Sequence, residues 1–154
     1  MPLYELLSAE RVAIVVEPGD RNTVLDVAAR MLCDGNASTA FALRASLGER
    51  ERLASTAIDH GVAIPHARTP LFENSRGAFL RLAQPIDFGA IDGRPVDLVL
   101  AMAIPEHHVQ QHLQLLAELA ERFADNGFLE RLRTAPNVAE LSYRLLDHCR
   151  RSAA

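Results

Sequence analysis

The longest uninterrupted run of apolar residues covers 98–104, within a nearly continuous apolar segment over 96–104. A segment of this length without alternating polar positions is typical of a strand that is buried on both faces of a sheet. It is far shorter than the roughly 20 apolar residues that a membrane-spanning helix requires. The pattern therefore predicts a central buried strand in a soluble protein that does not insert into a membrane.

Shorter apolar segments predict the other strands of the sheet. We expect strands at 11–16, 55–58, 62–67 and 77–82. In the last of these, Phe79 and Arg81 fall on one face, because alternate residues of a strand share a side. The segment 84–95 contains two glycines, two prolines and two aspartates, which predicts a loop.

Apolar positions with a period of 3.6 residues predict the helices of the first third of the chain. A short helical turn is expected at 3–8, followed by a helix that begins after an N-cap at Asp20 and ends at Gly35. Its buried face is expected to hold Val24, Leu25, Val27, Ala28, Met31 and Leu32. A second helix is expected to open at Ser38 or Thr39 and to run toward Arg52, with an apolar side of Phe41, Ala42, Ala45 and Leu47.

The same period returns after the buried strand and predicts the C-terminal helices. One is expected from His108, with an apolar stripe of Val109, Leu113, Leu116, Leu119, Ala120 and Phe123. A short helix is expected at 128–133. The last helix begins at Asn137, with Glu140 placed to complete a capping box, and ends near 150–151.

Strands grouped between helical blocks predict an α/β sandwich in which a mixed β-sheet is flanked by helices. A chain of 154 residues is long enough to bury one substantial core, so we expect a single domain over 1–154. The strand order does not follow from this pattern.

The net charge and the cysteine pattern bear on two properties of the protein, nucleic-acid binding and cellular location. Twenty acidic residues against sixteen arginines, with no lysine, leave a formal charge of −4, which argues against a general nucleic-acid binder. Cys33 and Cys149 have no CxxC spacing, and no signal peptide follows Met1. We therefore expect reduced thiols and a cytoplasmic location.

The segment Gly61-Val-Ala-Ile-Pro-His66 is a candidate for chemistry. Pro65 cannot donate to a sheet ladder, so it predicts a strand end, and it holds Ile64 extended. Gly61 allows another backbone to approach closely. A nucleophile or a ligand would be presented in this way at a rigid strand exit. Taken alone, however, a Pro-His pair is more often an ordinary loop histidine.

The stretch from 50 to 68 resembles the phosphorylation-site segment of the enzyme IIA proteins of the bacterial phosphotransferase system, in the fructose–mannitol branch. That family pattern is met by Arg50, Glu51, Leu53, Thr56, Gly61, Ala63, Pro65 and His66. Two further family signatures follow in order, QPIDFGAIDGRPVDLVLAMAIP and QQHLQLLAELA. The resemblance covers nearly the whole chain and is greatest to the free-standing nitrogen-regulatory type. It implies the same α/β fold.

The resemblance also implies the roles of three residues. His66 would accept a phosphoryl group and carry it as a tele-phosphohistidine intermediate. Arg50, sixteen residues earlier, matches the family's active-site arginine and would contact the phosphoryl oxygens. His112, in a His-Leu pair, matches a second active-site histidine that would orient His66 or bind the phosphoryl group.

Supporting roles are expected for Ser55, Thr56 and Gly61. Ser55 and Thr56 could offer a hydroxyl or a backbone amide to the phosphate, although Thr56 could equally serve local turn bonding. His60 is a candidate for the rim of the pocket. A structural loop that shapes the wall of the site is expected from Asp92, Gly93, Pro95 and Asp97.

A zinc site is the alternative chemistry. His107 and His108 precede His112, and the His-x3-His spacing on one helix is compatible with zinc. No nearby cysteine or patterned carboxylate supplies a fourth ligand, and the family is not a metalloprotein. We therefore expect no metal and no cofactor.

Three functions follow as hypotheses. In the first, the protein is a phosphoryl carrier that takes phosphate from an HPr-like phosphocarrier protein and regulates target proteins by its phosphorylation state. In the second, it is the IIA component of a fructose or mannitol permease and passes phosphate to a IIB domain. The third is a binding module that keeps the fold without phosphorylation, which the set of Arg50, His66 and His112 argues against. A weak homodimer is left open.

Overall fold

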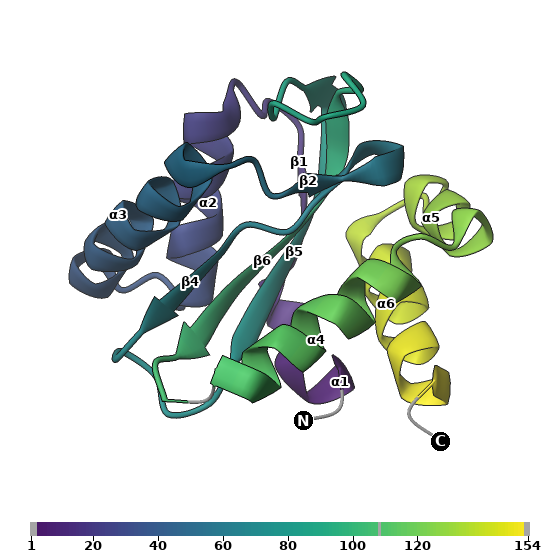
Figure 1. The fold of residues 1–154 in the computed structure, drawn as a ribbon. Helices are drawn as coiled ribbons and strands as arrows, with labels where there is room; N and C mark the ends of the chain where they lie inside the picture. The colour runs from purple at the N-terminus through teal and green to yellow at the C-terminus, as the bar shows by residue number, and fades with distance from the viewer. Residues whose placement is uncertain (1–2, 108, 153–154) are drawn as a thin grey trace.

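Strand β6 (Val96–Pro105) lies at the centre of the sheet, as its apolar sequence predicts (Figure 1). The computed structural model describes residues 3–107 and 109–152 of the chain. Every residue of β6 except Asp97 is buried. It pairs with β5 (Arg76–Ile86) in antiparallel fashion on one side, and with two short parallel strands on the other.

The sheet contains both parallel and antiparallel pairs, which confirms the predicted α/β fold with a mixed sheet. Its strand order is β1-β5-β6-β3-β2, with β4 pairing with β6 as well. The remaining strands are β1 (Val12–Val15), β2 (Ala57–Ile58), β3 (Val62–Ala63) and β4 (His66–Thr69). Strand β5 extends to Ile86, so the predicted loop is shorter and lies between Ile86 and Val96.

The predicted strand over 62–67 is interrupted at 64–65. Both of its parts keep the same register against β6, because Val62 pairs with Leu98 and His66 pairs with Met102, each 36 positions further along. Pro65 lacks an N–H and cannot donate to the ladder, but its carbonyl accepts a hydrogen bond from the amide of Met102 at 2.9 Å. The strand is therefore broken locally without losing its alignment.

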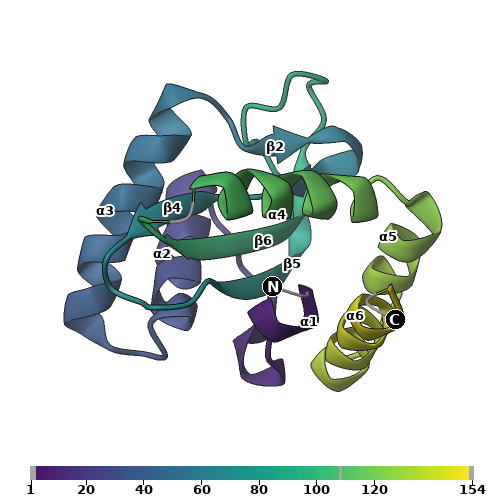
Figure 2. The ribbon, with the colours of Figure 1, turned by 60° about the horizontal axis from the view of Figure 1, so that its bottom comes forward.

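Helices cover both faces of the sheet (Figures 1 and 2). One face carries α2 (Arg21–Leu32) and α3 (Ala37–Leu53). The other carries α1 (Leu3–Leu6), α4 (Val109–Arg122), α5 (Asn126–Arg133) and α6 (Val138–Ser152). Two single-turn 3₁₀ helices, at Ala9–Arg11 and Asp59–Gly61, complete the described elements.

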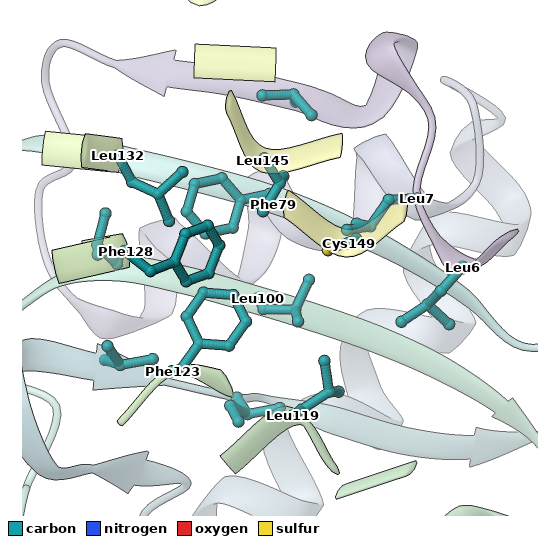
Figure 3. Packing of buried hydrophobic residues seen from close by; sticks show 14 of the residues in the cluster. Leu6, Leu7, Phe79, Leu100, Leu119, Phe123, Phe128, Leu132, Leu145 and Cys149 are labelled. Atoms are coloured by element: carbon teal, nitrogen blue, oxygen red, sulfur yellow. The ribbon is translucent and has the colours of Figure 1, made fainter. Parts of the chain in front are cut away.

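Alternate residues of β6 contribute to two separate clusters of buried side chains. Its larger residues face α4, α5 and α6: Leu98, Leu100, Met102 and Ile104. Its smaller residues face α2 and α3: Val99, Ala101 and Ala103. Figure 3 shows the first cluster, in which Phe79, Phe123 and Phe128 pack close to Leu100. The small side chains on the other face allow α2 and α3 to approach the sheet closely.

The predicted buried side of α3 is wrong at three of its four positions. Phe41, Ala42 and Ala45 are exposed, and only Leu47 of that set is buried. The buried stripe is instead Ala40, Leu43, Leu47 and Glu51. Both stripes have a helical period, so contact with the sheet and α2, which are distant in sequence, selects between them.

The stripe predicted for α4 is correct at Leu119 and Phe123 but wrong at Leu113, which is 59% exposed. The buried positions include His112 and Leu115. His108 and the side chain of the residue after it lie outside the described part of the chain. The shift places His112 on the sheet-facing side of the helix.

The helix caps agree with the sequence at two places and differ at two. Asp20 accepts from the amide of Thr23, and Asn137 accepts from the amide of Glu140. The carboxylate of Glu140 pairs with Arg144 instead of closing the predicted capping box. The first turn of α3 is capped by Asn36 rather than by Ser38 or Thr39. Asp125 caps α5, which therefore begins at Asn126, two residues earlier than predicted.

Two arginines fasten α5 to the sheet. Arg81 of β5 donates to the carbonyls of Leu132, Arg133 and Ala135 at the end of that helix. Arg133 in turn forms a bidentate ion pair with Asp97 of β6, with nitrogen–oxygen distances of 2.8 to 3.2 Å. Carbonyls at a helix C-terminus lack intrahelical partners, so the guanidinium of Arg81 satisfies groups that would otherwise be left unpaired.

Candidate functional site

A cavity of about 420 Å³ lies where α3, β4 and α4 meet. It is lined by Ser46, Glu49, Arg50, Leu53, His66, Ala67, Arg68 and His112. The structure therefore brings together the three residues to which the sequence assigned chemistry, Arg50, His66 and His112. Each comes from a different element, so the cavity depends on how the two helical layers pack against the edge of the sheet.

His66 is held by the break in the strand that precedes it. It is the first residue of β4, so the residue begins a strand rather than leaving one as predicted. Its Nδ1 lies 2.8 Å from the carbonyl oxygen of Ile64. Because a carbonyl can only accept, Nδ1 must carry the proton and donate it. The other ring nitrogen, Nε2, then keeps its lone pair and is the nucleophilic atom of the ring.

The surroundings of His66 keep its ring neutral at pH 7. Burial lowers the pKa of His66 below its ordinary value, and the nearby charges of Arg50 and Arg68 lower it further. The hydrogen bond to Ile64 opposes this by raising the pKa, but the net direction is downward. A neutral imidazole is the form that can attack an electrophile.

His112 lies edge-on to His66, with the ring centroids 5.3 Å apart and the ring planes at 69°. It is only 6% exposed, and its Nδ1 has no hydrogen-bond partner among the described residues. Burial, followed by the charges of the neighbouring groups, lowers the pKa of His112 to about 4. Both histidines of the site are therefore neutral at physiological pH.

Two arginines give the cavity a positive character. Arg50, in the last turn of α3, donates from Nη1 to the carbonyl of Ala54 at 2.7 Å, which leaves its other N–H groups for a ligand. Arg68 lies two residues after His66, on the same side of β4, and is exposed. Neither forms a salt bridge with any described carboxylate, although Glu49 lines the same cavity. The pair suits a phosphoryl group, which guanidinium groups bind in bidentate fashion.

The sequence assigned the contact with the phosphoryl oxygens to Arg50, and the structure places Arg68 in the same cavity. The signal was the alternation of strand residues, by which positions 66 and 68 share a face. Arg52, the neighbour most easily confused with Arg50, lines a different cavity together with Arg21 and Arg44.

The three supporting residues do not line the cavity. Ser55 donates its hydroxyl to the carbonyl of Phe88, and Thr56 bonds the carboxylate of Glu51 through its amide and its hydroxyl. Gly61 has a positive φ of 76° and lies against the ion pair of Arg133 with Asp97. Their contacts are structural, because each faces a neighbouring element rather than the space beside His66.

His60 and the 92–97 segment also lie away from the cavity. The carbonyl of His60 accepts from Arg133, and Asp97 is engaged in the ion pair with the same arginine. These residues stabilise the opposite end of β3 and β6 and do not form the predicted wall of the site.

The zinc alternative finds no support in the described residues. His107 is exposed, and His108 lies outside the described part. Within 3–107 and 109–152, no group of three histidine, cysteine or acidic side chains is arranged to hold a metal ion. Over the same residues, no helix is both long and apolar enough to cross a bilayer.

The lowered pKa of His112 predicts that acid destabilises the fold through this residue. Between about pH 6.5 and pH 4, the unfolded chain binds a proton at this position and the folded chain does not, so stability rises with pH across that window. The contribution is fully present above pH 6.5 and is lost as the pH falls to 4. In thermal melts, the fall in melting temperature from pH 7 to pH 4 should be smaller for His112→Gln than for the unsubstituted protein. His107→Gln, on an exposed position, should follow the unsubstituted protein; parallel curves for all three proteins would contradict the assignment.

Comparisons with known proteins identify the family of the chain. A family described as "Phosphoenolpyruvate-dependent sugar phosphotransferase system, EIIA 2" matches residues 5–148. The chain is 34% identical over 146 residues to a nitrogen regulatory protein of Bradyrhizobium diazoefficiens, covering 95% of each chain. It is 36% identical over 148 residues to a nitrogen regulatory protein of Pseudomonas aeruginosa, covering 94% of each.

A solved structure shows the same fold. The crystal structure of the nitrogen regulatory protein IIA-Ntr from Neisseria meningitidis superposes with a TM-score of 0.84 at 30% identity, covering 94% of this chain and 97% of that one. The resemblance indicated by the three sequence motifs is thereby confirmed. The chain belongs to the EIIA type 2 family of the phosphoenolpyruvate-dependent sugar phosphotransferase system, and is similar within it to the nitrogen regulatory proteins.

Proposed function

We propose that this protein is a phosphoryl carrier that accepts a phosphoryl group on Nε2 of His66 from the phosphohistidine of an HPr-like phosphocarrier protein. The observation that supports this most directly is the contact of Nδ1 with the carbonyl of Ile64. It leaves Nε2 unprotonated in a cavity that also contains two arginines without carboxylate partners among the described residues. Family membership supports a role in phosphoryl transfer.

The transfer requires no net change of protonation at His66. The lone pair of Nε2 attacks phosphorus, a new nitrogen–phosphorus bond forms, and the bond to the donor's histidine breaks, with its electron pair returning to that nitrogen. The proton on Nδ1 stays in its hydrogen bond with Ile64. Arg50 and Arg68 stabilise the charge on the equatorial oxygens, and His112 offers a neutral ring beside the reacting atoms.

We further infer that phosphorylation regulates partner proteins, as the names of the relatives suggest. A phosphoryl group adds roughly −1.5 to −2 charges to a surface whose nearest basic residues are Arg50 and Arg68. The change is local and leaves the buried β6 strand untouched, so the readout is a difference in partner affinity rather than a new fold. Such a carrier would act in the cytoplasm, where its donor is phosphorylated.

Phosphorylation should depend on His66 alone. With phosphoenolpyruvate, enzyme I and an HPr-type carrier, we expect one phosphoryl group per chain, lost in acid because a phosphoramidate is acid-labile. Intact-protein mass spectrometry of the unsubstituted protein and of His66→Ala measures this. Label that survives acid, or that persists in His66→Ala, would sink the proposal.

The two arginines should contribute separately to the rate. Arg50→Ala and Arg68→Ala should each slow transfer, by up to about 10³-fold for an arginine that contacts the transferring group and by less in an exposed cavity such as this one. The rate is measured by rapid quench with the phosphorylated carrier in excess. Arg52→Ala is the matched control, because that residue lies in the neighbouring cavity. An equal loss in the control would show that general charge, not contact with phosphate, sets the rate.

The regulatory function should appear as phosphorylation-dependent binding of partners. Pull-downs from cell extract would use the unphosphorylated protein, the phosphoprotein and His66→Asp at the same salt concentration. We expect at least one partner to be retained by only one phosphorylation state. If all three baits retain the same partners, and the phosphoprotein passes its group to a IIB domain rapidly, the sugar-permease function is the better account.

A further inference from the structure

Glu51 is the only buried carboxylate among the residues whose exposure is described, and it is 3% exposed. No described cation lies within salt-bridge distance of it, although Arg21, Arg44 and Arg52 line the cavity that it borders. Its two oxygens instead accept from the amide of Thr56 at 3.1 Å and from the hydroxyl of the same residue. One residue, through its main-chain amide and its hydroxyl, thus satisfies both oxygens of the carboxylate.

Burying a carboxylate without a cation to close a turn is energetically unfavourable. Its desolvation costs free energy that hydrogen bonds only partly offset, and an uncharged group of similar size would often stabilise the fold as well. What the arrangement supplies is a defined geometry, because both oxygens have directional partners on one residue. The turn between Glu51 and Thr56 holds two parts of the site in place.

The turn holds Arg50 on one side. Arg50 directly precedes Glu51 in α3, and its guanidinium donates to the carbonyl of Ala54 within the turn at 2.7 Å. Bonding Thr56 back to Glu51 fixes where the 54 carbonyl lies relative to the end of the helix. The hydrogen bond to Ala54 in turn sets the direction in which the other N–H groups of Arg50 point into the cavity.

The same turn holds His66 on the other side. The carbonyl of Thr56 accepts from the amide of Ile64 at 3.0 Å, and the carbonyl of Ile64 accepts from Nδ1 of His66 at 2.8 Å. Ile64 lies in the break between β3 and β4 and belongs to neither strand, so the regular hydrogen bonds of the sheet do not hold it. Thr56 is therefore the described residue that fixes the amide end of Ile64.

We propose that Glu51 and Thr56 are positioning residues for the reaction at His66: their buried pair orients the Ile64 carbonyl that selects the tautomer of His66, and sets the reach of Arg50 into the same cavity. The proposal rests on the function proposed above and deepens it. It assigns to the motif residues Glu51 and Thr56 a role that requires no contact with phosphate.

The test uses Thr56→Val, which keeps the shape and the amide but removes the hydroxyl, and Thr56→Ser, which restores the hydroxyl. In two-bond nitrogen–proton NMR spectra of the unphosphorylated protein, His66 should be almost entirely in the Nδ1–H tautomer. In Thr56→Val the tautomers should mix, and transfer should slow on the order of 10-fold, since a misplaced reacting group loses rate steeply. In Thr56→Ser, the tautomer population of His66 and the transfer rate should both return most of the way to those of the unsubstituted protein.

A second pair of variants separates positioning from general destabilisation. Glu51→Gln keeps one acceptor for the Thr56 amide and should give an intermediate tautomer mixture, which covers the case in which Thr56→Val does not fold. Arg81→Met removes the anchor of α5 and lowers stability away from the site; its His66 tautomer and transfer rate should match the unsubstituted protein.

The proposal is overturned if Thr56→Val or Glu51→Gln leaves the tautomer of His66 unchanged, or if Arg81→Met shifts it equally. Because the tautomer is read without phosphate, this outcome is distinct from failure of the proposed function. An unsubstituted protein that shows the expected tautomer but accepts no phosphoryl group would refute the carrier function and leave the positioning contacts standing.

Discussion

The break at Ile64 and Pro65 in a strand that otherwise keeps its register with β6 is the constraint on which the site depends. A continuous strand would commit the carbonyl of Ile64 to the sheet, and a lost register would move His66 to the other face. The amide of Ile64 bonds Thr56 on the side of the strand away from β6, and its carbonyl accepts from the imidazole, while the continued register keeps His66 opposite Met102. The tautomer of the ring is thus a consequence of the backbone.

The two faces of β6 determine what surrounds that ring. Large side chains on one face support α4, which carries His112 over the sheet, and small ones on the other allow α3 to approach closely. The last turn of α3 then lies near the edge strand β4, so Arg50 reaches the cavity from the opposite layer. A site built from both layers requires the whole sandwich, and it cannot form from the His66 segment alone.

The site is positively charged, although the chain as a whole is negatively charged. The protein carries −4 overall, yet two arginines without carboxylate partners among the described residues flank two neutral histidines. Burial and the positive neighbours keep both rings deprotonated, which suits a nucleophile but costs stability in acid. The same positive charges that disfavour a protonated ring favour a phosphorylated one, so one arrangement serves both states.

The sequence by itself determined the features that depend on local pattern. The apolar run of β6, the order of helices and strands, and the strand end before Pro65 follow from periodicity and backbone chemistry, and the family motif selected Arg50 and His112. Tertiary contacts decided the rest. They chose the buried stripe of α3 that leaves Phe41 exposed, turned Thr56 toward Glu51 rather than the cavity, and placed Arg68 beside His66. The physical reason is that a periodic pattern gives the shape of an element, whereas the direction that each side chain faces depends on neighbours that are distant in the chain.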